Sequence, residues 1–185
     1  TGLKGITIPS QVTSISGYTF SGCTGLREVN LPEGLTTIYA YAFENCTGLT
    51  SIDIPDSVTT MSGRAFYNCT NLTEVGYPAG LTTILSYRND SSDFTSYYAS
   101  PFQGCSSLTE IEIPEGVTAI PAYTFRCFTS LSSVTIPDSV DTIGSYAFGG
   151  CTGLSNIDLP EDLATVNTYA FSGCTGLKGI TIPSQ

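Results

Sequence analysis

A repeat of 23 residues runs through this chain and constrains its fold more than any other feature. Eight prolines mark the repeat in two evenly spaced series: Pro9, Pro32, Pro55 and Pro78, then Pro114, Pro137, Pro160 and Pro183. The interval between the two series is 36 residues, which is 23 plus 13. We therefore count seven full repeats, the start of an eighth and one insertion at 86–98. Because one such unit cannot bury its own apolar face, the copies must stack into a solenoid.

The first part of each unit is typical of a short strand. In residues 131–154, LSSVTIPDSVDTIGSYAFGGCTGL, Val134 and Ile136 alternate with polar residues, as on one face of a strand. Pro137 ends this strand because it has no N–H to donate to a ladder. Stacked copies then give a parallel, in-register sheet on one face of the solenoid.

The second part of the unit predicts another extended segment and then a corner. Val140 and Ile143 indicate a second short strand. The following Tyr-Ala-Phe-x-x-Cys predicts a tight 3₁₀ or helical corner that turns Phe148 inward. The expected fold is a single β-rich solenoid over residues 1–185, with the sheet on one face and short corners on the other.

Register across the repeats predicts rows of like side chains. One row is formed by the phenylalanines of the corners: Phe20, Phe43, Phe66, Phe102, Phe125, Phe148 and Phe171. Six cysteines share another position: Cys23, Cys46, Cys69, Cys105, Cys151 and Cys174. Disulfides between adjacent rungs are one interpretation, and a row of buried free thiols is the other, which we favour. Cys127 is the expected exception, because Phe128 takes the row position there.

The motifs I-x-I-P-x-x-V, A-F-x-x-C and the closing x-x-L resemble the BspA-like leucine-rich repeat, the 23-residue type found mainly in bacterial surface proteins. The resemblance spans the whole chain except the insertion. It implies a secreted or cell-surface protein, and adhesion to a protein or a glycan of a host matrix or another cell.

The two ends of the sequence carry the same eleven residues, TGLKGITIPSQ, at 1–11 and 175–185. Either a longer parent protein contains a super-repeat of 174 residues, or the repeat consensus has produced a coincidence. Since no initiator Met is present, we expect a fragment of a longer chain. Neither end has a polar capping repeat, so we also expect end-to-end stacking of Ile180 and Ile182 on Ile6 and Ile8 of a neighbour.

Composition excludes several classes of function. The chain has 16 Asp and Glu against 6 Lys and Arg, a net charge of −10, so phosphate backbones and anionic lipid should repel it. The sequence contains no run of 18 apolar residues, so we expect no membrane insertion. Histidine is absent, which removes the commonest general base and metal ligand. We expect no enzyme activity, no cofactor and no metal; a glycan-active enzyme is a remote alternative, since an exposed sheet does not bury a catalytic carboxylate.

Two groups of residues are candidates for ligand binding. The first lies in the insertion, where aromatic residues and Arg stand among Ser, Asn and Asp as in antibody binding loops: Tyr87, Arg88, Asp90, Asp93, Phe94, Tyr97 and Tyr98. These rings could instead pack over neighbouring rungs and fill the gap left by the longer unit. The second group consists of carboxylates at outward strand positions: Glu28, Asp53, Glu74, Glu110, Glu112 and Asp158.

The outward strand positions form the presumed concave face of the solenoid. Its carboxylates could bind a cation or a basic partner, or could be no more than a solvated acidic surface. The function that we predict is a non-enzymatic binding module of an extracellular or cell-surface protein. The alternative is a rigid structural spacer that presents other domains.

Overall fold

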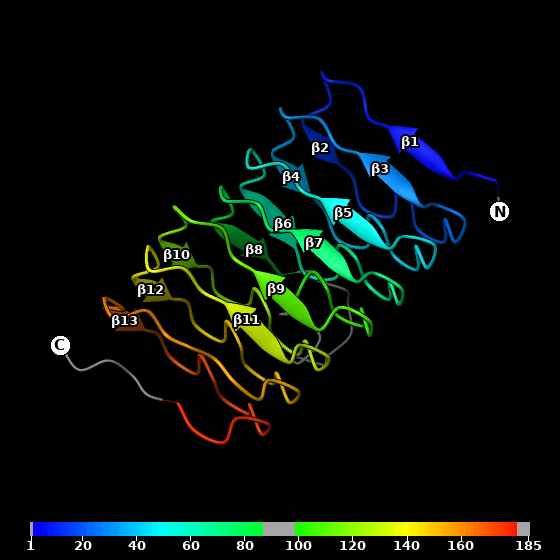
Figure 1. The fold of residues 1–185 in the computed structure, drawn as a ribbon. Coiled ribbons are helices and arrows are strands. Elements are labelled where there is room, and N and C mark those ends of the chain that lie inside the picture. The colour runs from blue at the N-terminus through cyan, green and yellow to red at the C-terminus, as the bar shows by residue number, and fades with distance from the viewer. Residues whose placement is uncertain (1, 87–98, 181–185) are drawn as a thin grey trace.

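The computed structural model describes residues 2–86 and 99–180 of the chain. The predicted parallel, in-register solenoid is confirmed, and each repeat forms one rung of it (Figure 1). The first strands of the rungs lie on one face: β1 (Gly5–Thr7), β3 (Glu28–Asn30), β5 (Ser51–Asp53), β7 (Glu74–Gly76), β9 (Glu110–Glu112) and β11 (Ser133–Thr135). The second strands lie behind them: β2 (Ser14–Ile15), β4 (Thr37–Ile38), β6 (Thr60–Ser62), β8 (Thr83–Leu85), β10 (Ala119–Ile120), β12 (Thr142–Ile143) and β13 (Thr165–Val166).

Each paired strand residue faces its own equivalent in the next repeat. Ile6 pairs with Val29, and Ile52 with Val75, each 23 residues further along the chain. The middle residue of each first strand points into the core, while its two neighbours point outward. In β9, for example, Ile111 is buried between two exposed glutamates. The predicted alternation of period two is therefore present on the face of the first strands, which we call the first-strand face.

The prediction of helical or 3₁₀ corners is wrong. Among the described residues the corners are successive hydrogen-bonded turns, with bonds such as Glu44 N–H to Tyr41 C=O at 3.1 Å and Cys46 N–H to Phe43 C=O at 3.3 Å. Left-handed residues recur within each corner, as at Tyr41 (φ 59°) and Asn45 (φ 55°). A right-handed helix cannot wind through such residues, because its backbone needs negative φ at every position.

Buried phenylalanines form the predicted row, with one interruption. Phe43 stacks on Phe66 with a centroid distance of 5.0 Å, and Phe66 stacks on Phe102 at 5.5 Å. The next member of the predicted row, Phe125, lies against Tyr77 at 6.2 Å, while Phe102 packs on Phe128 at 6.2 Å. At this one junction the Phe-on-Phe stacking of equivalent residues is therefore replaced by contacts of Tyr77 and Phe128, two residues that depart from the repeat consensus.

The junction between the fourth and fifth rungs, which we call the seam, interrupts both strand ladders. The second strands form one sheet from β2 to β8 and another from β10 to β13. The first strands pair two by two, so β7 and β9 share no ladder either. At the corner, Ser100 N–H donates to Arg126 C=O, three residues beyond the register position Tyr123. The seam follows the longer fourth repeat, whose predicted insertion falls mostly outside the described residues.

The cysteine row consists of free thiols, as predicted. The five donating thiols bond to carbonyls of an earlier rung; for example, Cys69 Sγ donates to Phe43 C=O at 3.0 Å and Cys151 Sγ to Phe125 C=O at 2.9 Å. Cys127 lies off the row, as predicted, and is half-buried; Cys23 and Cys174, at the two ends of the row, are half-buried rather than buried as expected. The structure does not test end-to-end stacking: Ile180 is exposed, Ile6 is half-buried, and Ile182 lies outside the described residues.

Candidate functional site

The structure separates the two groups of candidate residues. All seven candidates in the insertion lie outside the described residues: Tyr87, Arg88, Asp90, Asp93, Phe94, Tyr97 and Tyr98. Five carboxylates of the second group lie in first strands, whereas Asp158 is exposed but lies in no strand; the five are Glu28, Asp53, Glu74, Glu110 and Glu112. The structure brings three of them, Glu74, Glu110 and Glu112, to the rim of one groove and leaves Glu28 and Asp158 toward the two ends.

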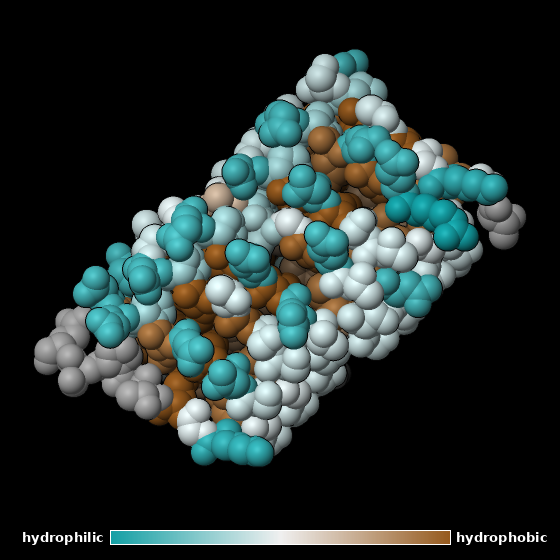
Figure 2. Space-filling model, viewed as in Figure 1, coloured by the Kyte–Doolittle hydropathy of each residue, from teal (hydrophilic) through white to brown (hydrophobic). Residues whose placement is uncertain are grey.

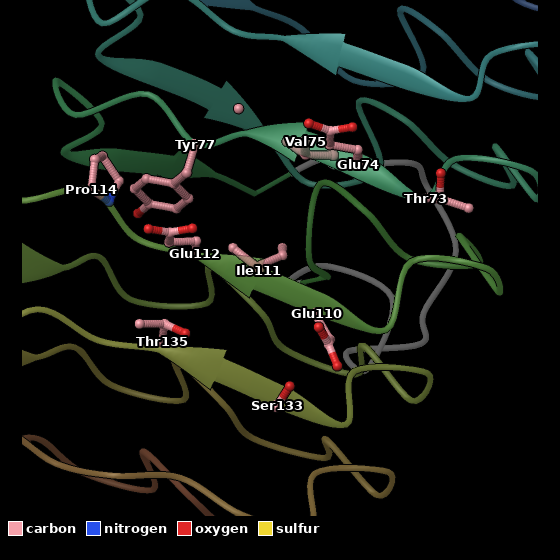
Figure 3. Close-up of a pocket in the computed structure, with 11 residues that line it drawn as sticks. Thr73, Glu74, Val75, Tyr77, Glu110, Ile111, Glu112, Pro114, Ser133 and Thr135 are labelled. Carbon is pink, nitrogen blue, oxygen red and sulfur yellow. The ribbon is translucent and has the colours of Figure 1, made fainter.

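This groove, which we call the seam groove, lies between β7 and β9 and has a volume of about 520 Å³. Its rim carries the three glutamates together with the hydroxyl-bearing side chains of Thr73, Ser133 and Thr135 (Figure 3). Its floor is apolar and is formed by the remaining lining side chains: Val75, Tyr77, Ile111 and Pro114. On the first-strand face as a whole, hydrophilic side chains stand singly over hydrophobic ones (Figure 2).

Local sequence explains why the groove opens at this point. No strand ladder joins β7 to β9, and the ladder behind them is also interrupted at the seam. Gly76 occupies an outward position at which the other first strands carry a polar side chain, such as Asp53 or Glu112. Without a side chain at Gly76, the carboxylate of Asp53 lies directly against that backbone. Asp53 therefore occupies the space that a side chain at position 76 would take, and the groove opens on the other side of β7, where the ladder to β9 is missing.

Tyr77 is the unusual residue of the groove floor. The equivalent residue of other repeats is aliphatic, as at Ile54 and Ile113. Tyr77 follows the end of β7 (Figure 3), and its ring packs against Phe125. Only 5% of its surface is exposed, and its hydroxyl makes no hydrogen bond with any described residue. The nearby Thr124 hydroxyl donates to the Pro121 carbonyl at 2.8 Å instead. Burial raises the pKa of Tyr77.

We expect Tyr77→Phe to stabilise the protein by about 1–3 kcal/mol, because a buried hydroxyl without a partner carries its full desolvation penalty. The ring, and so its packing on Phe125, is kept. Chemical denaturation of both proteins measures the difference. Thr124→Val is the comparison, since it removes a hydroxyl that is bonded and should destabilise. A loss of stability in Tyr77→Phe would mean that the hydroxyl has a partner in solution.

Sequence reasoning identified the three glutamates but not the groove. The hydroxyls of Ser133 and Thr135 and the ring of Tyr77 were not predicted as parts of a site. Two signals pointed to the place: a tyrosine in an aliphatic row, and a glycine among outward polar residues, both next to the insertion. The suggestion that Glu110 and Glu112 hold a cation with Glu74 or Asp53 finds no support, because no group of three or more metal-ligating side chains exists in the described ranges.

The seam groove combines negative charge, hydroxyls and an apolar surface. Glu74, Glu110 and Glu112 are exposed, so the rim offers negative charge and hydrogen-bond acceptors to a ligand. The hydroxyls can both donate and accept, and the apolar floor can cover an aliphatic or ring surface. Within residues 2–86 and 99–180, no helix could cross a membrane.

Comparison with known proteins places the sequence in one family. The family described as "BspA type Leucine rich repeat region" matches residues 1–97 and 90–185, in six copies. A leucine-rich repeat protein from Eubacterium ventriosum is 28% identical, with a TM-score of 0.69, over 100% of this chain and 45% of its own. The T. pallidum leucine-rich repeat protein TpLRR is also 28% identical, with a TM-score of 0.59, over 95% of this chain and 67% of its own.

A third solved structure is that of a leucine-rich cell surface protein from Faecalibacterium prausnitzii. It is 34% identical, with a TM-score of 0.46, over 98% of this chain and 48% of its own. The chain thus spans less than half of two of these three relatives. Among proteins of curated function, none matches.

Proposed function

This chain belongs to the BspA-type leucine-rich-repeat family, and on that premise we propose that it is a non-enzymatic recognition module of a secreted or cell-surface protein. The observation that carries the proposal is the seam groove, a hollow with a charged and hydroxyl-bearing rim on an otherwise regular sheet. Its volume falls within the range of roughly 300–1,000 Å³ that ligand pockets occupy. The ligand class is a protein or a glycan of a matrix or of another cell surface.

The aromatic residues of the insertion are the second part of the proposed binding surface. Tyr87, Arg88, Phe94, Tyr97 and Tyr98 have the composition of binding loops, in which aromatic rings supply contact area with few rotatable bonds. In solenoids, insertions into single repeats often form the binding face. The predicted insertion follows β8, which belongs to the same rung as the β7 wall of the groove.

A structural spacer is the competing function, and the regular core supports it. Ladder bonds and stacked rings repeat from rung to rung on both sides of the seam. Such a rod could hold other domains apart without binding anything itself. The spacer does not need the acidic rim, the hydroxyls or the apolar floor of the groove.

Deletion of residues 86–98 separates these functions. We expect the intact chain to bind at least one member of an array of matrix proteins and glycans, and the deletion to reduce that binding by about tenfold or more. The deletion restores the 23-residue spacing, so the rungs should still stack. A second variant replaces residues 87–98 with Gly and Ser of equal length, and circular dichroism checks that both variants fold.

Two results would count against the recognition module. If the intact chain binds no protein or glycan of the array, the spacer becomes the better description. If both variants bind as tightly as the intact chain, the insertion is not part of the surface and the groove alone remains. Hydrolysis of any glycan on the array would instead support the remote enzymatic alternative.

A further inference from the structure

We propose that the seam groove binds an extended segment of a partner protein that carries lysine or arginine side chains. This inference names the partner class and rests on the proposed recognition function. It depends on three features of the described residues: charge on the rim, unpaired strand edges in the walls, and an apolar floor.

The charge on the rim is negative and is not neutralised from within the groove. Glu74 stands on β7, and Glu110 and Glu112 stand on β9, with all three side chains exposed. No lysine or arginine belongs to the lining residues. The whole chain carries a net charge of −10, so its field attracts a cationic segment before contact is made.

The walls of the groove are strand edges that do not pair with each other. β7 pairs with β5 on its far side, and β9 pairs with β11 on its far side, but no ladder joins β7 to β9. Peptide N–H and C=O groups along such edges are the groups to which extended peptides bond when they bind beside a strand. A similar gap separates β3 from β5, but there the ladder behind is continuous through β4 and β6.

The floor of the groove is apolar. Val75, Tyr77 and Ile111 line it and are buried, and the Tyr77 hydroxyl lies beneath the surface, out of reach of a ligand. The aliphatic stems of Lys and Arg suit the apolar floor, and their charged ends suit the carboxylates.

Direct binding to a simple probe tests the proposal. The probe is a short peptide of alternating Lys and Ser, titrated into the 185-residue chain at low salt; a peptide of alternating Gln and Ser is its neutral control. The groove variant is Glu74→Gln/Glu110→Gln/Glu112→Gln. The matched variant is Glu28→Gln/Asp158→Asn/Glu161→Gln, which removes the same charge at exposed positions outside the groove lining.

We expect the groove variant to weaken binding of the Lys-Ser peptide by about tenfold or more, and the matched variant by about threefold or less. Thr135→Tyr fills the groove without changing charge and should also weaken binding. All substituted side chains are exposed, so thermal unfolding should be unchanged. The affinity should fall as salt is raised, because screening weakens contacts between exposed charges.

Three outcomes would overturn the proposal. Equal losses in the groove variant and the matched variant would mean that the peptide binds diffuse charge. Failure of the unmodified chain to bind the Lys-Ser peptide would also exclude it. In the third outcome, the unmodified chain fails to bind the peptide while a glycan of the array binds it and not the groove variant; the ligand of the groove would then be that glycan. In either of the last two cases, binding of the unmodified chain to the array would leave the recognition function standing.

Discussion

Replacing Phe66 with alanine is expected to lower the free energy of unfolding by about 3–5 kcal/mol, because the substitution empties the middle of the core. Phe66 is fully buried and is stacked between Phe43 and Phe102, with centroid distances of 5.0 and 5.5 Å. In a solenoid each interior rung is held by both of its neighbours, so one cavity weakens two interfaces. Urea denaturation followed by circular dichroism measures the loss.

Phe171→Ala is the matched control for Phe66→Ala. Phe171 belongs to the same row and stacks on Phe148 at 5.2 Å, but it is only half-buried, and Phe148 is the only phenylalanine on which it stacks in the described residues. We expect it to lose less than half as much stability as Phe66→Ala. Equal losses in the two variants would contradict the interpretation that interior stacking stabilises the rod. A change in the denaturant slope of Phe66→Ala would show that the rungs on its two sides unfold separately.

A rise from pH 8 to pH 10 under reducing conditions is expected to remove about 3 kcal/mol of stability through Cys69 and Cys151 alone. A hydrogen bond with the Cys105 thiol, together with burial, raises the pKa of Cys69 from 9.0 to about 12. Burial raises the pKa of Cys151 from 9.0 to about 12. Both thiols are fully buried. Each should contribute about 1.4 kcal/mol to the loss over this interval.

The sign follows from which state keeps its proton. Above pH 9 the unfolded chain releases these protons, while the folded chain retains them until about pH 12. Their contribution is therefore complete below pH 9 and declines as the pH rises toward 12. The raised pKa values of Cys46 and Tyr77 act in the same direction.

Urea midpoints at the two pH values measure the alkaline loss. The double variant Cys69→Ala/Cys151→Ala is the comparison: it should be less stable at pH 8, but its further loss at pH 10 should be about 3 kcal/mol smaller. An unchanged alkaline loss in the double variant would show that other groups cause it. Cys23, which is half-buried, gives a control variant, Cys23→Ala, for the removal of a cysteine as such.

Much of the fold was predictable because the same strand and corner pattern recurs in seven repeats. Val134 and Ile136 alternate as a strand does, and the same pattern recurs at the same spacing, which requires register between neighbours. The free thiols were predictable for the same reason, because cysteines in one row lie along a line. In the candidate site, the exposed positions of Glu74, Glu110 and Glu112 followed from the alternation within β7 and β9.

The errors and omissions arose where local pattern and three-dimensional packing disagree. The corners resembled helical turns in sequence, but left-handed residues such as Tyr41 turn the chain the other way. The tyrosines give little sequence warning, but Asn45 and the glycine at its equivalent position in other repeats, such as Gly22, favour positive φ. Phe102 was expected to stack on Phe125, but the shift at the seam places it on Phe128.

Sequence by itself determined the solenoid, the inward row of phenylalanines on either side of the seam and the row of thiols, because each depends only on spacing that repeats along the chain. Only the tertiary structure decided that both ladders stop at one junction, that Tyr77 lies in the floor of a groove there, and that three of the six outward carboxylates share its rim. The physical reason is that a periodic pattern describes contacts between equivalent residues. The seam consists of contacts between residues that are not equivalent, and these form only when the whole rod packs.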